Sequence, residues 1–221
     1  MPHMQPYLLH KVQNNHFLLT GSRVMFWEEQ RILVLSDLHI GKSGHFRKNG
    51  IGIPQTVCKE DLQRLFAQIR YFNPASLLVI GDLFHSTENR EHDLFVRWRK
   101  DLSGLSVILV KGNHDILPDA WYRRAGIDCF ENTFTSGEFS FTHDVECHKP
   151  AGKTYCFSGH VHPGIVMHGN GKQTLRFPCF HFGIEHAVLP AFGKFTGLHT
   201  VKPKRGDHVY ALVDEQVMKI Q

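Results

Sequence analysis

The sequence predicts an α/β fold in which buried strands alternate with crossover helices, followed by a second, largely antiparallel sheet. Strands covered on both faces carry apolar residues continuously, and such runs occur at residues 32–35, 77–80 and 107–110. Amphipathic helical patterns separate these runs, and the order strand, helix, strand, helix, strand is typical of an α/β domain. Ligands of such sheets bind beyond the carboxyl ends of the strands, so functional residues are expected there.

The first half of the chain shows each element in turn. Residues 1–30 predict short antiparallel strands, because apolar residues 7–9 and 17–19 flank a polar turn and residues 24–27 precede another. After the strand at 32–35, residues 41–52 are rich in glycine and basic side chains and predict a loop. One apolar face predicts a helix from Pro54 to Asn73, and similar spacing predicts another from Arg90 to Leu102.

Short strands dominate the second half of the chain. Apolar runs with turn signals predict the strands 139–142, 155–158, 172–182, 193–198 and 209–213. A length of 221 residues suits one well-buried domain, and neither a linker nor an internal repeat divides the sequence. We therefore expect a single domain over residues 1–221.

Composition narrows the class of protein. With 25 basic and 21 acidic side chains, the net charge of +4 favours an anionic partner without requiring one. The five cysteines are scattered and form no C-x-x-C pair, which argues against a disulfide framework or a zinc ribbon and fits a reducing cytoplasm. No run approaches the roughly 18 to 20 apolar residues that span a bilayer, so a cytoplasmic protein without a membrane anchor is expected.

Metal-binding side chains follow five of the apolar runs. They are, in chain order, Asp37 and His39, Asp82, Asn113, His143, and His160 and His162. In an extended strand end, residues two apart point to the same side, which would bring Asp37 together with His39. Carboxylate, imidazole and amide donors suit manganese, iron or zinc. A lone Asp-x-His pair is weak evidence, but five ordered occurrences indicate a metal site, with Asp82 as the bridge between two ions.

Two metal ions favour one kind of reaction. They can polarise a phosphoryl oxygen, activate water and neutralise charge in an in-line displacement, which is the chemistry of phosphoester hydrolysis. A histidine is the natural general acid for the departing alkoxide, and His114, next to Asn113, is our candidate. Asp115 could orient the imidazole of His114, or it could cap the turn.

The motifs Asp37-Leu38-His39, Gly81-Asp82, Gly112-Asn113-His114-Asp115 and Gly159-His160-Val161-His162 resemble those of the calcineurin-like metallophosphoesterases. The resemblance implies a four-layered αββα sandwich with a dinuclear centre. It implies that Asp37, His39 and His162 hold one metal ion, that Asn113, His143 and His160 hold the other, that Asp82 bridges them and that His114 is catalytic. His148 competes with His143, which we favour because it directly follows an apolar run.

Further motifs are similar to those of the DNA ligase-associated metallophosphoesterases, a bacterial subfamily of DNA-damage-response endonucleases. They lie at residues 38–42, 46–47, 81–86, 160–164, 176–180 and 189–197, and the resemblance extends from about Leu19 to the end of the chain. It implies a DNA endonuclease that uses manganese, and it implies repair partners such as a DNA ligase or helicase.

Basic residues next to the metal ligands could contact the substrate. Lys42, His45, Arg47 and Lys48 follow His39 and could hold the phosphates that flank the scissile bond, although a solvated basic loop needs no such role. His85 either lies beside the site or is an ordinary loop residue.

Two other functions stay open. The same chemistry could act on small nucleotides or nucleotide-linked phosphodiesters, as it does in other members of the wider family. Alternatively, the fold could serve as a non-catalytic scaffold in a repair complex.

Overall fold

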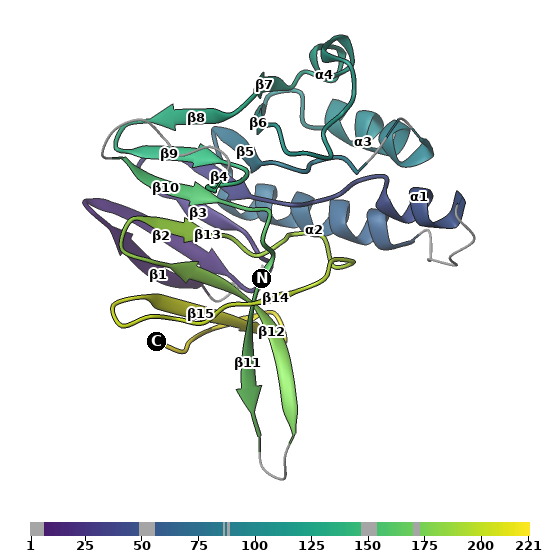
Figure 1. Ribbon diagram of the computed structural model, residues 1–221. Helices are drawn as coiled ribbons and strands as arrows, with labels where there is room; N and C mark the ends of the chain where they lie inside the picture. Colours follow the sequence, from purple (N-terminus) through teal and green to yellow (C-terminus); the bar gives the residue numbers. More distant parts are fainter. Residues whose placement is uncertain (1–6, 49–55, 86, 88, 147–153, 170–172) are drawn as a thin grey trace.

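The computed structural model describes residues 7–48, 56–85, 87, 89–146, 154–169 and 173–221. Two β-sheets pack face to face, and helices cover the outer face of the first sheet (Figure 1). No described helix combines the length and the apolar character that crossing a membrane requires.

The first sheet has seven strands that lie side by side in chain order. They are β1 (Tyr7–Val12), β2 (Asn15–Thr20), β3 (Met25–Trp27), β4 (Ile32–Leu35), β5 (Ser76–Ile80), β6 (Ser106–Val110) and β7 (Asp128–Phe130). Strands β1 to β4 pair antiparallel, and β4 to β7 pair parallel. This confirms the predicted antiparallel start and the α/β half that follows it.

The described helices are α1 (Lys42–Lys48), α2 (Thr56–Phe72), α3 (Arg90–Lys100) and α4 (Asp119–Arg124). Helices α2, α3 and α4 connect successive parallel strands, and right-handed crossovers between strands added in one direction all fall on the same face of a sheet. Helix α2 turns Cys58, Leu62, Leu65 and Ile69 toward that face. Helix α3 ends two residues before the predicted end, in a turn at residues 101–104.

Helix α1 occupies most of the segment for which the sequence predicted a loop, so that prediction is wrong for residues 42–48. The reason is a tertiary contact. Glu91, on α3, accepts hydrogen bonds from the amide of Gly41 (3.0 Å) and the hydroxyl of Ser43 (2.5 Å). These bonds fix the first turn of α1 in spite of its glycine-rich sequence, because tertiary contacts override weak local propensity. Residues 49–52 lie outside the described part.

The second sheet has nine strands in the order β14-β11-β12-β13-β10-β9-β8, with β15 paired to β12 and β16 to β15. They are β8 (Thr133–Ser136), β9 (Phe139–Thr142), β10 (Tyr155–Ser158), β11 (Pro163–His168), β12 (Thr174–Phe182), β13 (His186–Val188), β14 (His199–Thr200), β15 (His208–Val213) and β16 (Gln216–Lys219). The sheet is largely antiparallel, as predicted, but β10 lies parallel to both β9 and β13.

The predicted strand at residues 193–198 is wrong, because the structure has no strand there and β14 begins only at His199. The preceding residues bond to a loop of the first sheet instead. The amide of Phe192 donates to the carbonyl of Ser36 (2.8 Å), and that of Gly193 donates to Asp37 (3.1 Å).

One core lies between the two sheets, and another lies between the first sheet and the helices. Because neighbouring residues of a strand point to opposite faces, Leu77 and Val79 pack under the helices while Leu78 and Ile80 face the second sheet. This arrangement confirms the mixed α/β fold with two packed sheets. Of the four layers of the αββα sandwich that the resemblance implies, however, the described residues show only one helical layer, because the described helices all lie between β4 and β7 in the chain. Helices α2, α3 and α4 pack on the first sheet. On the outer face of the second sheet Val201, outside the strands, packs against a small buried cluster.

Candidate metal centre

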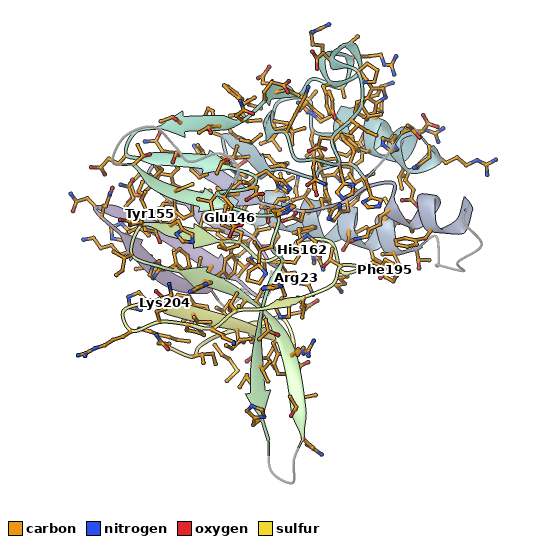
Figure 2. All side chains as sticks on the ribbon, in the orientation of Figure 1. Arg23, Glu146, Tyr155, His162, Phe195 and Lys204 are labelled. Atoms are coloured by element: carbon orange, nitrogen blue, oxygen red, sulfur yellow. The ribbon has the colours of Figure 1, made fainter. Side chains whose placement is uncertain are left out.

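The candidate site lies where β4, β5, β6, β9 and β10 end. The loops after these strands carry the seven predicted ligands, and the structure brings all seven together. The label of His162 in Figure 2 marks this region at the junction of the two sheets.

The backbone of the ligand loops is left-handed rather than extended. Positive φ angles between 50° and 64° occur at Asp37, His39, Asp82, His160 and His162. The extended geometry expected at the strand ends is therefore wrong. Such conformations cost of order 1–3 kcal/mol each in residues other than glycine and persist only where the surroundings enforce them. Here the amide of Asp37 donates to Gly81 (3.0 Å) and that of His39 donates to Asp82 (2.9 Å).

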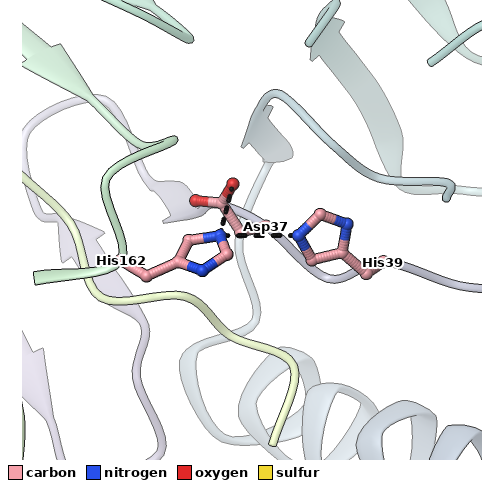
Figure 3. Close-up of side chains that lie close together, drawn as sticks. All are labelled: Asp37, His39 and His162. Atoms are coloured by element: carbon pink, nitrogen blue, oxygen red, sulfur yellow. Dashed lines mark hydrogen bonds and ion pairs between the residues drawn. The ribbon is translucent and has the colours of Figure 1, made fainter. Parts of the chain in front are cut away.

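One group of ligands consists of Asp37, His39 and His162 (Figure 3). Nε2 of His162 lies 3.2 Å from Oδ1 of Asp37 and 3.4 Å from Nε2 of His39. One ligand atom from each residue therefore points at a common centre, all within 4.8 Å of one another.

A second group surrounds His143. Its Nε2 lies 3.5 Å from Oδ2 of Asp82, 3.3 Å from Oδ1 of Asn113 and 3.1 Å from Nδ1 of His160. Oδ2 of Asp82 is also 3.9 Å from Nε2 of His39, in the first group. A single carboxylate oxygen thus faces both groups, which is the position that a bridging ligand needs. His148, the competitor of His143, lies outside the described residues.

The charges and protonation states in the site fit divalent cations. Burial lowers the pKa of His39 to about 2, so its imidazole is neutral, which is the form that binds metals. Burial also acts to lower the pKa of His143, but the hydrogen bond and the charge of Asp82 outweigh it and raise that pKa to about 9, so this position favours a positive charge. Oδ1 of Asp37 is buried and lies against Nε2 of His162, another candidate ligand, which is neutral when it binds a metal. Such an oxygen is costly unless a cation binds it.

Three glycines leave room for the ligands. A methyl group built at Gly81 would lie 1.9 Å from Nδ1 of His143, and one at Gly112 would lie 2.2 Å from Oδ1 of Asp82. At Gly159 it would lie 2.7 Å from Oδ2 of Asp37. The glycines of the three motifs are therefore part of the site, because a side chain there would displace a ligand.

His114 lies beside the ligands. Its ring stacks on that of His85 with a centroid distance of 4.4 Å and an interplanar angle of 29°. Nδ1 of His85 is 3.3 Å from Nδ1 of His39, and the amide of His114 donates to Oδ1 of Asp82 (2.9 Å). Both predicted histidines therefore border the centre.

The carboxylate of Asp115 faces the backbone, in agreement with the turn-capping alternative. It accepts hydrogen bonds from the amides of Gly112 (2.9 Å), Phe84 (2.9 Å) and Leu83 (3.4 Å). Burial raises its pKa to about 7. Asp115 therefore ties the loop after β6 to the loop after β5, and these bonds do not support the expected orientation of His114 by Asp115.

The structure describes only some of the side chains that were expected to contact the substrate. Lys42 begins α1 and is half-buried; burial lowers its pKa, while the charges of Asp37 and Asp82 act against that shift. Its ammonium is thus within the electrostatic field of the two carboxylates. The side chain of Arg47 lies outside the described part.

A pocket of about 570 Å³ opens next to the second group of ligands. It is lined by residues that include Asn113, His143, Asp144 and His160. Oδ2 of Asp144 lies 3.9 Å from Nε2 of His160, so Asp144 adds negative charge at this rim. Sequence reasoning did not assign Asp144 a role, although it directly follows His143.

Comparisons with known proteins were consistent with this geometry. Residues 30–191 match the family described as calcineurin-like phosphoesterase. The crystal structure of Pseudomonas putida nuclease MPE is 25% identical and covers 96% of this chain and 100% of its own, with a TM-score of 0.81. YfcE, a phosphoesterase from E. coli, is 13% identical and covers 86% of this chain and 97% of its own, with a TM-score of 0.45. No curated protein matches the sequence.

Proposed function

Because this chain belongs to the calcineurin-like phosphoesterase family, we propose that it is a dinuclear metal-dependent phosphodiesterase that cuts DNA as an endonuclease. The observation that carries the proposal is the position of Asp82, whose Oδ2 faces His39 on one side and His143 on the other. Two groups of nitrogen and oxygen donors joined by one carboxylate support a pair of divalent ions.

Each ligand has a proposed place. Asp37, His39 and His162 would hold one ion, Asn113, His143 and His160 would hold the other, and Asp82 would be shared by both. The donor set is compatible with manganese, iron and zinc, and we propose manganese on the resemblance to the DNA ligase-associated subfamily. When bound, the ions would supply Lewis-acid activation of the phosphodiester and of the attacking water.

The side chains around the ions bind substrate and move protons. His114 donates a proton to the departing oxygen, and the ring of His85, stacked on it, restricts the orientation of its imidazole. Lys42, Arg47 and His85 contact the phosphates on either side of the scissile bond. Asp115 has a structural role in this mechanism, since its carboxylate is engaged by backbone amides.

DNA is the substrate favoured by the likeness to a nuclease. Pseudomonas putida nuclease MPE shares the fold over nearly the whole length of both chains. The net charge of +4 suits a polyanion. A role in DNA repair, beside a ligase or a helicase, is proposed on the subfamily resemblance alone.

A reducing compartment is the proposed location. Among the described cysteines, Cys129, Cys156 and Cys179 are free thiols. Free thiols are usual where the cell keeps cysteines reduced, so we propose the cytoplasm.

Hydrolysis by the purified protein with Mn²⁺ tests the function. The substrates are an aryl phosphodiester, a labelled DNA strand and a cyclic nucleotide, and the variants are His114→Ala and Asp82→Asn. We expect the unaltered protein to cut the aryl ester and the DNA, and both variants to lose cutting. His168→Ala, an exposed histidine on β11, is the matched control and should retain full activity.

Two other outcomes of this experiment would favour the alternative functions. Cutting of the small esters with intact DNA would favour a small nucleotide substrate. No turnover of any substrate would favour a binding scaffold, in which case binding of a repair protein should survive Asp82→Asn.

A further inference from the structure

The backbone of Ala191–Gly193 lies along the loop that carries Asp37. Ser36 and Ala191 form an isolated parallel bridge. The amide of Phe192 donates to the carbonyl of Ser36 (2.8 Å), and the amide of Gly193 donates to the carbonyl of Asp37 (3.1 Å). This short segment therefore fixes the peptide units on both sides of Asp37.

Two arginines donate hydrogen bonds to the carbonyl groups of the segment Ala191–Gly193. Nη1 of Arg23 donates to the carbonyls of both Ala191 and Gly193, at 3.1 Å each. Nη2 of Arg64 donates to the carbonyl of Phe192, between them. All three carbonyls of the segment are thus bound by guanidinium groups, while the amides of Phe192 and Gly193 bond to the loop that carries Asp37.

The arginines are themselves held in place. Nη2 of Arg64 is 2.9 Å from Oδ1 of Asp61, and its guanidinium carbon lies 4.1 Å from the centre of the Phe192 ring. Burial lowers the pKa of Arg64 to about 10, which leaves it charged at neutral pH. The charge of Asp61 acts on both Arg23 and Arg64, and Glu215 adds a weaker attraction to Arg64. Because buried charge is costly without compensating bonds, the carbonyl contacts are needed by the arginines as well.

Asp37 depends on such support. It is fully buried and has a φ of 53°, a conformation that an aspartate keeps only when its surroundings enforce it. On one side its amide donates to the carbonyl of Gly81 (3.0 Å), and on the other its carbonyl accepts from Gly193 (3.1 Å). If the second side were released, the backbone could relax and turn the carboxylate away from His162.

We propose that Arg23 and Arg64 are positioning residues that orient Asp37 for its metal ion, through the backbone of Ala191–Gly193. The inference rests on the dinuclear centre of the proposed function. Neither arginine touches the substrate or an ion in this account. Their effect is on the affinity of one metal position, that of Asp37, His39 and His162.

Metal titration of matched arginine variants tests the proposal. Mn²⁺ binding is followed by the electron paramagnetic resonance signal of the free ion, without DNA, for Arg23→Gln and Arg64→Gln. The control is Arg99→Gln, because Arg99 also donates to backbone carbonyls, those of Leu102, Leu105 and Gly126, but away from the centre. We expect affinity for one of two ions to fall about 10- to 100-fold in the first two variants, and to stay unchanged in Arg99→Gln.

A conservative variant separates positioning from folding. A single nitrogen of Arg23 reaches both carbonyls, so Arg23→Lys should recover part of the lost affinity, and it serves in place of Arg23→Gln if that variant does not fold. Equal and unchanged binding of both ions in the Arg23, Arg64 and Arg99 variants would overturn the positioning role and leave the proposed function standing. A lack of Mn²⁺ binding by the unaltered protein would overturn both.

Discussion

At the scale of single residues, the metal centre is limited by space as much as by its ligands. The side chains of Asp82 and His143 pass directly over Gly112 and Gly81, at positions where a β-carbon would collide with them. The motif glycines are therefore needed because they have no side chain. Their replacement should disturb the metal ligands more than the fold.

Gly112→Ala tests this requirement. The added methyl group would lie 2.2 Å from Oδ1 of Asp82 and must displace it, so we expect phosphodiester hydrolysis to fall about 100-fold, the cost of an ångström-scale misplacement. The measurement is kcat/KM on an aryl phosphodiester with saturating Mn²⁺. Gly104→Ala is the control, because no atom lies within 4 Å of the added carbon there. Equal activity of the two variants would contradict the account.

Asp115→Asn tests the structural role of this carboxylate. The variant has one oxygen acceptor in place of two for three backbone amide donors, so we expect unfolding to become easier by about 1–3 kcal/mol. The measurement is chemical denaturation at pH 8, paired with kcat of the folded protein. A loss of kcat of several orders of magnitude with unchanged stability would show a catalytic role instead.

The sequence predicted which residues lie at the metal centre, but not where each of their side chains points. The order of motifs was enough to select Asp37, His39, Asp82 and His160, because each follows an apolar strand. It could not place the carboxylate of Asp115, since adjacency to His114 in the chain says little about where a side chain points. The sequence pattern likewise did not predict the left-handed φ angles of the ligands, because only glycine commonly indicates such a conformation.

At the scale of elements, helix α1 is positioned by α3. Oε2 of Glu91 accepts from the amide of Gly41, and Nδ2 of Asn89 donates to the carbonyl of Gly41 (3.2 Å). Lys42 therefore stands near the metal carboxylates because of contacts about 50 residues away in the chain. No local pattern could reveal this, which is why the sequence indicated a loop.

Glu91→Ala should release α1 and weaken the hold on DNA. We expect KM for a DNA strand to rise several-fold while kcat/KM for a small aryl ester changes little, because the contacts proposed for Lys42 and Arg47 are with flanking phosphates, which only a polymer has. Asp93→Ala, an exposed acidic residue in the same first turn of α3, controls for the lost charge. A parallel loss on both substrates would contradict a role confined to flanking contacts.

At the scale of the whole molecule, the two sheets share one core, and we propose that residues 1–221 fold as a unit. His10 of β1 marks their junction, since its Nδ1 lies 2.8 Å from the hydroxyl of Tyr210 on β15. Burial, followed by the charges of His208 and Lys219, lowers the pKa of His10 to about 4. The folded state therefore binds fewer protons here than the unfolded state.

The pH dependence of stability follows from the lowered pKa of His10 in the folded state. A base whose pKa falls on folding stabilises the protein above its ordinary pKa near 6.5 and loses this contribution as the pH falls from there toward 4. We expect the free energy of unfolding, measured by urea denaturation, to fall between pH 7 and pH 5. This fall should be smaller in His10→Phe than in the unaltered protein, by on the order of 1 kcal/mol. His168→Phe, on β11, should leave the difference unchanged. An identical loss in all three proteins would contradict the role of His10.

The measurement that tests the central claim most directly is anomalous X-ray diffraction from crystals grown with Mn²⁺. We expect two anomalous peaks roughly 3.5–4 Å apart, with Oδ2 of Asp82 between them, Asp37, His39 and His162 around one, and Asn113, His143 and His160 around the other. A single peak, or two peaks that do not share Asp82, would contradict the dinuclear centre on which the proposed function depends.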